Sequence, residues 1–96
     1  MLARAGTLAL TASPNPARGG SDLVVRAEPG RRVHLAVVDA SGRQVRSLEG
    51  VVTASGGLRL HWDGRDSDGR RVGVGLYLIQ ARTEGERAAA KLVLLE

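Results

Sequence analysis

The sequence predicts an all-β fold, an antiparallel sandwich of two sheets with about seven strands. Short runs rich in Val, Leu and Ala alternate between apolar and polar residues, which is the period of a half-buried strand. Turn-forming residues, 13 glycines among them, separate these runs. No stretch repeats apolar residues at helical spacing over three turns. The length of 96 residues fits one domain over residues 1–96, with residues 1–6 expected to be a flexible lead-in.

The first strand is predicted at residues 7–11, which alternate in polarity. Pro14 and Pro16, on either side of Asn15, end this strand because proline fixes φ and has no N–H to donate to a sheet. A glycine-containing turn is predicted at residues 17–21.

Two further alternating strands follow, with a turn between them at Pro29-Gly30. Their apolar faces consist of Leu23, Val25 and Ala27 in the first strand and of Val33, Leu35 and Val37 in the second. Residues 39–43 then predict a tight hairpin, with Gly42 in the left-handed region that glycine adopts without steric cost. The returning strand is predicted at residues 44–53, and residues 55–57 break it.

In the next strand Leu58, Leu60 and Trp62 share one face, so Trp62 is predicted to fill the core as its largest ring. Residues 63–75 are predicted to form a loop. Residues 76–82 are nearly all apolar, which favours a central strand covered on both faces. A second hairpin turn at residues 83–86 leads into a last strand at residues 87–95. Strands of this number and spacing are typical of an immunoglobulin/fibronectin type III-like sandwich, with a small barrel as the alternative.

The composition excludes several kinds of site and partner. The chain has no Cys, so neither a disulfide nor a thiolate zinc site can form. The net charge of +4 comes mainly from scattered arginines, which favours a solvated basic surface over a polyanion-binding stripe. With only two aromatic residues, no nucleic-acid partner is predicted. No run is long enough for a membrane span.

Several motifs occur in a fixed order along the chain. They are Pro14-Asn15-Pro16, residues 39–43, Trp62-Asp63-Gly64, Asp66, Asp68-Gly69, Val72, Gly75-Leu76-Tyr77 and Lys91-Leu92-Val93-Leu94. Together they resemble a bacterial immunoglobulin-like family. This family is shared by the type A C-terminal sorting domains of type IX secretion and the immunoglobulin-like domain of the flagellar hook-capping scaffold. The resemblance covers nearly the whole chain.

The resemblance implies a non-catalytic C-terminal module of a secreted or surface bacterial protein that reaches its place through the periplasm. Its partner would be a protein, the export machinery, and a cargo domain would precede it. Two alternatives stay open: an assembly module like the hook-capping domain, with flagellar subunits or its own copies as partners, and a carbohydrate-binding accessory domain. The last is disfavoured because sugar platforms use exposed aromatic rings.

The motif residues also have structural explanations. Asp63 can accept hydrogen bonds from the turn that follows it, and Gly64 and Gly69 permit positive φ. Tyr77 begins a strand after a long loop, where a tyrosine hydroxyl can hold loop backbone, as in a tyrosine corner. Gly75 precedes it.

The sequence contains no strong candidate for a catalytic or metal site. Asp63, Asp66 and Asp68 are the only weak metal candidates, and their register to Gly69 does not match an EF-hand loop. His34 and His61 lie on different predicted strands in the polar phase. No nucleophile elbow, phosphate-binding loop or dinucleotide motif occurs, so no enzyme activity and no cofactor are predicted.

The last apolar segment has two interpretations, as a core strand or as an interaction segment. A terminal edge strand can be recognised by another protein through its unpaired backbone groups. The residues assigned to sorting or interaction are Lys91, Leu92, Val93, Leu94 and Leu95.

Overall fold

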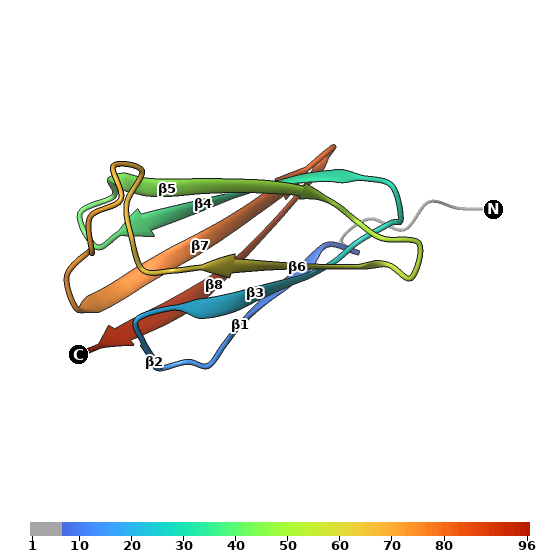
Figure 1. Ribbon diagram of the computed structural model, residues 1–96. Coiled ribbons are helices and arrows are strands. Elements are labelled where there is room, and N and C mark those ends of the chain that lie inside the picture. The colour runs from blue at the N-terminus through green and yellow to red at the C-terminus, as the bar shows by residue number, and fades with distance from the viewer. Residues whose placement is uncertain (1–6) are drawn as a thin grey trace.

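The computed structural model describes residues 7–96, and the lead-in predicted at residues 1–6 lies outside the described residues. Two β-sheets pack face to face as an immunoglobulin-like sandwich (Figure 1). The smaller sheet contains β1 (Ala9–Ser13), β3 (Ser21–Arg26) and β6 (Gly57–Trp62), in that order. The larger has the order β2–β8–β7–β4–β5 and contains β2 (Ala17–Arg18), β4 (Arg32–Asp39), β5 (Gln44–Val51), β7 (Gly75–Thr83) and β8 (Glu86–Leu95). The all-β sandwich predicted from the sequence is confirmed.

The short strand β2 differs from the prediction. A turn was predicted at residues 17–21, but Ala17 and Arg18 pair in parallel with Leu94 and Leu95 of β8. The prediction is therefore wrong for these two residues, since a two-residue strand is too short to show alternation. The other described strand pairs are antiparallel.

The core lies between the two sheets and is built from the alternating apolar positions. Trp62, at the end of β6, is fully buried with 0% exposure. Its ring meets Tyr77 edge-on, with 5.4 Å between ring centroids and 62° between ring planes. Its indole N–H donates to the carbonyl oxygen of Arg65 at 2.9 Å, so the one large polar ring is both packed and satisfied. The other fully buried large side chains are those of Leu23, Val25, Val33, Leu35, Val37, Ile79 and Leu92.

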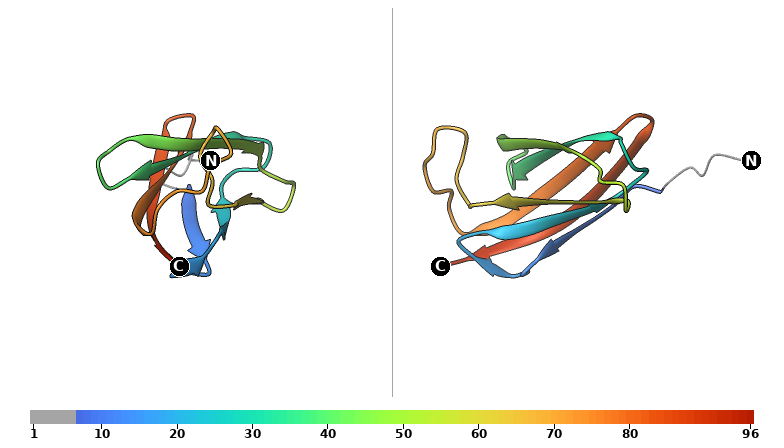
Figure 2. Two further views of the ribbon diagram at one scale, coloured as in Figure 1. Left: turned by 60° about the vertical axis from the view of Figure 1, so that its left-hand side comes forward. Right: turned by 45° about the vertical axis from the view of Figure 1, so that its right-hand side comes forward.

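Strand β7 is central in its sheet but covered on one face only. Tyr77, Ile79 and Ala81 face the core, whereas Leu76, Gln80 and Arg82 are exposed on the outer face. The prediction that residues 76–82 are covered on both faces is wrong. The cause is that the sandwich has two layers, so the outer face of the larger sheet meets no third layer among residues 7–96 (Figure 2).

The pattern Asp-x-x-Gly-Arg forms the same turn twice. In the first turn, the hairpin between β4 and β5, the backbone N–H of Asp39 donates to the carbonyl oxygen of Arg43 at 2.9 Å. In the second, inside the β6–β7 loop, Asp66 N–H donates to Arg70 at 2.8 Å. The glycine at the fourth position of each turn, Gly42 or Gly69, has a positive φ, 90° in the first turn and 81° in the second. Residues 7–96 contain no helix with the length and apolar character needed to cross a bilayer.

Candidate functional site

Exposed apolar side chains gather beside the end of β8. The described residues expose four large apolar side chains, and three of them lie here: Val74, Leu76 and Leu95, with 59%, 47% and 41% exposure. Leu76 stands opposite the half-buried Val93 in the β7–β8 register. Val74 and Leu95 line one shallow hollow of about 470 Å³. We call Val74, Leu76, Val93 and Leu95 the terminal patch; such clusters often mark interaction sites.

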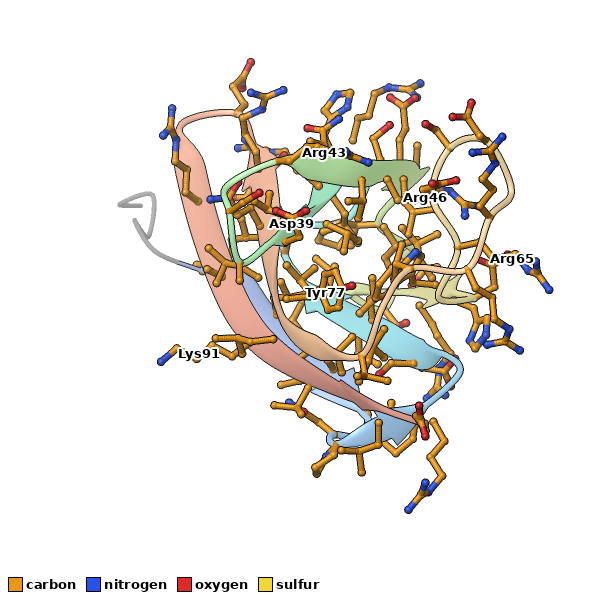
Figure 3. All side chains as sticks on the ribbon, turned by 90° about the vertical axis from the view of Figure 1, so that its left-hand side faces the viewer. Asp39, Arg43, Arg46, Arg65, Tyr77 and Lys91 are labelled. Atoms are coloured by element: carbon orange, nitrogen blue, oxygen red, sulfur yellow. The ribbon has the colours of Figure 1, made fainter. Side chains whose placement is uncertain are left out.

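Lys91 lies at the margin of this patch. It is exposed, and it points away from the body of the domain (Figure 3). Because side chains alternate along a strand, it shares the outer face of the sheet with Val93 and Leu95. Leu92 and Leu94 point the other way and are buried, with 0% and 5% exposure. The segment assigned to interaction therefore divides into three outward and two core side chains.

The backbone edge of this same segment is already occupied. The side-chain amide of Asn15 donates to the carbonyl oxygen of Lys91 at 2.7 Å, and its oxygen accepts from the N–H of Val93 at 3.0 Å. Leu94 and Leu95 then pair with β2. The backbone edge that was predicted to be unpaired in this segment is thus covered, and the side chains of Lys91 and Leu95 are its exposed part.

Asn15 covers the edge of β8, a contact that the sequence did not reveal. It lies between β1 and β2, where Pro14 and Pro16 flank it. The carbonyl of Pro14 accepts a hydrogen bond from the buried Ser21 hydroxyl at 2.9 Å, which ties this connection to β3. The Asn15 amide, which can both donate and accept, takes the place of a neighbouring strand here. The asparagine between two prolines is the sequence signal that could have drawn attention to it.

The long loop between β6 and β7 is held to the core by the motif residues. The hydroxyl of Tyr77 donates to the carbonyl oxygen of Gly73 at 2.6 Å, and burial, with the nearby charge of Asp39, raises the pKa of Tyr77. A Cβ on Gly64 would lie 2.0 Å from the carbonyl oxygen of Gly19, and its φ is 76°, so only glycine fits there. Gly75, at the start of β7, has a φ of 140°. This loop carries Val74 to the terminal patch.

Two of the three aspartates of this loop, Asp63 and Asp66, use their carboxylates to hold its turns. One carboxylate oxygen of Asp63 accepts from the N–H of Arg65 at 3.0 Å and from the guanidinium of Arg46 at 3.0 Å. One oxygen of Asp66 accepts from the N–H groups of Asp68 and Arg70 at 2.9 and 3.0 Å. The bond from Arg70 N–H is the main reason why the pKa of Asp66 lies below its ordinary value, and desolvation opposes this effect. No group of three His, Cys, Asp or Glu side chains within residues 7–96 is placed to hold a metal ion.

The two histidines do not converge on a site. His34 lies 3.5 Å from Glu49 on the larger sheet, and His61 lies 2.8 Å from Asp22 on the smaller one. Both histidines are exposed. The hydrogen bond with His61 is the main cause that lowers the pKa of Asp22, with the charges of His61 and Arg59 adding to it and desolvation opposing it. These are surface pairs between neighbouring strands.

Residues 11–86 match the model of a protein family described as the FlgD Ig-like domain. Among solved structures, a domain of dimeric latent PorU from Porphyromonas gingivalis superposes with a TM-score of 0.77 at 26% identity over 90% of this chain. FlgD from Xanthomonas campestris, whose structure concerns hook capping in flagellar assembly, gives a TM-score of 0.64 at 30% identity over 93% of this chain and 67% of its own.

A third similar structure is PorZ, a surface component of the type IX secretion system of Porphyromonas gingivalis. It gives a TM-score of 0.66 at 21% identity over 91% of this chain, which shows the shared fold alone. The present chain spans only 9% of PorU and 11% of PorZ. No match was found among curated protein sequences.

Proposed function

Since the chain belongs to the FlgD Ig-like domain family, we propose that it is a non-catalytic C-terminal sorting module of a secreted or surface protein, read by type IX export machinery at the terminal patch and Lys91. The observation that carries this proposal is the gathering of exposed apolar side chains beside the last strand. The similarity to a domain of PorU, at 26% identity and a TM-score of 0.77, supports it.

The mode of recognition follows from the covered backbone edge. Since Asn15 and β2 occupy that edge at residues 91–95, the machinery would bind the outward side chains of the folded domain. The apolar side chains of the patch would be buried against the machinery, and the ammonium group of Lys91 at its margin would orient the bound domain. Leu92 and Leu94 fix the strand from beneath.

The test is a reporter fused to the N-terminus of this domain in a bacterium with type IX secretion. We expect the reporter in the medium with the native domain, and at least a tenfold loss with Leu76→Glu or Lys91→Glu. Val51→Glu is the matched control, because Val51 is 46% exposed on β5, against 47% for Leu76, and lies outside the patch. Melting curves of each variant must match that of the native domain, since surface substitutions usually shift stability by no more than about 0.5 kcal/mol. A native fusion that folds but stays in the periplasm would disprove the sorting function.

A second candidate function is assembly, as in the hook-capping protein FlgD. The 30% identity to FlgD of Xanthomonas campestris favours it. In that case the terminal patch would bind flagellar subunits or a second copy of the domain. Self-association measured by analytical ultracentrifugation, abolished by Leu76→Glu and unaffected by Val51→Glu, would support assembly over sorting.

A carbohydrate-binding function lacks its usual platform. The two aromatic side chains of the chain, Trp62 and Tyr77, are both buried, with 0% and 6% exposure. The domain therefore has no exposed aromatic ring of Trp or Tyr on which a sugar could stack.

A further inference from the structure

A second surface lies on the outer face of the larger sheet, toward the β7–β8 hairpin and away from the terminal patch. Here a broad hollow of about 1040 Å³ crosses β5, β4, β7 and β8. Its lining includes Ala36, Ser47 and Ala89, whose small side chains leave the sheet surface low. The hairpin end and the C-terminal end of β8 lie at opposite ends of the domain (Figure 2).

A row of charged side chains crosses this hollow. The strand registers place Glu49 opposite His34, His34 opposite Arg82, and Arg82 opposite Arg87. Glu49 is matched within the domain by the guanidinium of Arg32 at 3.4 Å. Its charge is therefore largely compensated.

The two arginines at the other end of the row are not matched. Arg82 and Arg87 are directly opposite each other, so their Cβ atoms are about 5 Å apart, and like charges in such a pair destabilise a sheet. Neither takes part in any of the ion pairs formed within residues 7–96. Both side chains are exposed and line the hollow. A guanidinium group can bind a carboxylate through two parallel hydrogen bonds.

The shape and chemistry of the hollow favour a polypeptide as the source of that carboxylate. Four strands at about 4.8 Å spacing span about 14 Å, which matches about four residues of extended chain. Gln44 and Gln80 in the lining can bond to the backbone of such a chain. The lining has no Phe, Tyr or Trp side chain to serve as a broad stacking surface for a nucleobase or sugar ring.

We propose that this hollow binds a short acidic segment of a protein partner, with Arg82 and Arg87 holding its carboxylates. This site is distinct from the terminal patch and does not depend on the sorting function. The two surfaces share the outer face of one sheet, so one partner could be held at the hairpin end while another contacts the end of β8.

The test uses fluorescence anisotropy with a labelled peptide of four glutamates flanked by glycines. We expect binding that weakens as salt rises, because exposed charges are screened. The same peptide with glutamines should not bind. The double variant Arg82→Glu/Arg87→Glu should bind at least tenfold more weakly than the native domain. A melting curve checks that the double variant is folded. If it is not, the single variant Arg87→Glu, which reverses only one charge, takes its place in the binding measurement.

The matched control is Arg26→Glu/Arg70→Glu, which changes the net charge equally. Both of these arginines are exposed and lie outside the hollow. Retained binding in this control supports the proposal. Equal loss in both double variants, no binding at millimolar peptide, or tighter binding of an oligothymidine than of the acidic peptide would each overturn it.

Discussion

The two halves of β8 are held in different ways, although the same strand, β7, pairs with both. In the half at residues 91–95, Leu92 and Leu94 are buried, and Asn15 and β2 cover the outer edge. In the half at residues 86–90, the inward side chains of Ala88 and Ala90 are small, and no strand of residues 7–96 pairs with the edge. The half assigned to recognition is thus the better anchored one. A rigid strand presents its outward side chains at little entropic cost on binding.

Removal of the core ring beneath the anchored half should have the largest effect. Trp62 packs against Tyr77, which stands opposite Leu92 on β8. We expect Trp62→Ala to lower the free energy of unfolding by about 3–5 kcal/mol, a large part of the about 5–15 kcal/mol typical of a domain. Urea denaturation of both proteins measures it. A loss below about 1 kcal/mol would contradict the central place of Trp62 in the core.

Loss of the hydrogen bonds from Asn15 should weaken the half of β8 at residues 91–95 and leave the half at residues 86–90 unchanged. Asn15→Ala removes two hydrogen bonds to β8 and should cost about 1–2 kcal/mol. Hydrogen exchange of the Val93 N–H should become faster, while the amides that face β7 keep their protection. Asn15→Asp is the matched variant, because it keeps the acceptor for Val93 but loses the donor to Lys91. Unchanged Val93 exchange in Asn15→Ala would show that the cover does not hold the strand.

The sequence revealed the sandwich because its signals are local. Alternation identified the buried faces of β3, β4 and β6, and the glycine of the turn at residues 39–43 adopts positive φ. It did not reveal the cover over β8, because Asn15 and Lys91 are 76 positions apart. Nor could it place Leu76 on an open face, since an apolar run looks the same in a strand covered on one side or on both.

The open half of β8 has its own attachment, at Glu86, and this one depends on pH. The carboxylate of Glu86 accepts from the N–H of Leu8 at 2.9 Å and from the Thr7 hydroxyl at 3.3 Å. The bond from Leu8 is the main cause that lowers the pKa of Glu86 below its ordinary value of 4.5, against the opposing effect of desolvation. A lowered folded-state pKa stabilises the domain above the unfolded-state pKa, and this contribution disappears as the pH falls through the folded-state pKa.

We therefore expect Glu86→Gln to be less stable than the native domain at neutral pH, with a smaller loss than that of Asn15→Ala. The two proteins should become equal in stability in acid, below the pKa of Glu86. Urea denaturation across this pH range measures the difference. Glu84→Gln is the control for loss of one charge in the same hairpin, because the side chain of Glu84 is 90% exposed. A difference between Glu86→Gln and the native domain that persists in acid would rule out the carboxylate as its source.

The smallest effect is expected at Arg87, and its sign is opposite to that of the others. Arg87 stands opposite Arg82, so Arg87→Glu turns a repulsive cross-strand pair into an attractive one and should raise stability by about 0.2–1 kcal/mol. Arg87→Gln removes only the repulsion and should gain less. Urea denaturation at low and high salt separates the two contributions, because salt screens the exposed charges and should reduce both gains. A loss of stability in Arg87→Glu would mean that Arg87 holds the open half of β8 in place. A gain would mean that the domain keeps two opposed arginines at a cost to its own stability, a result that supports a binding role for the pair.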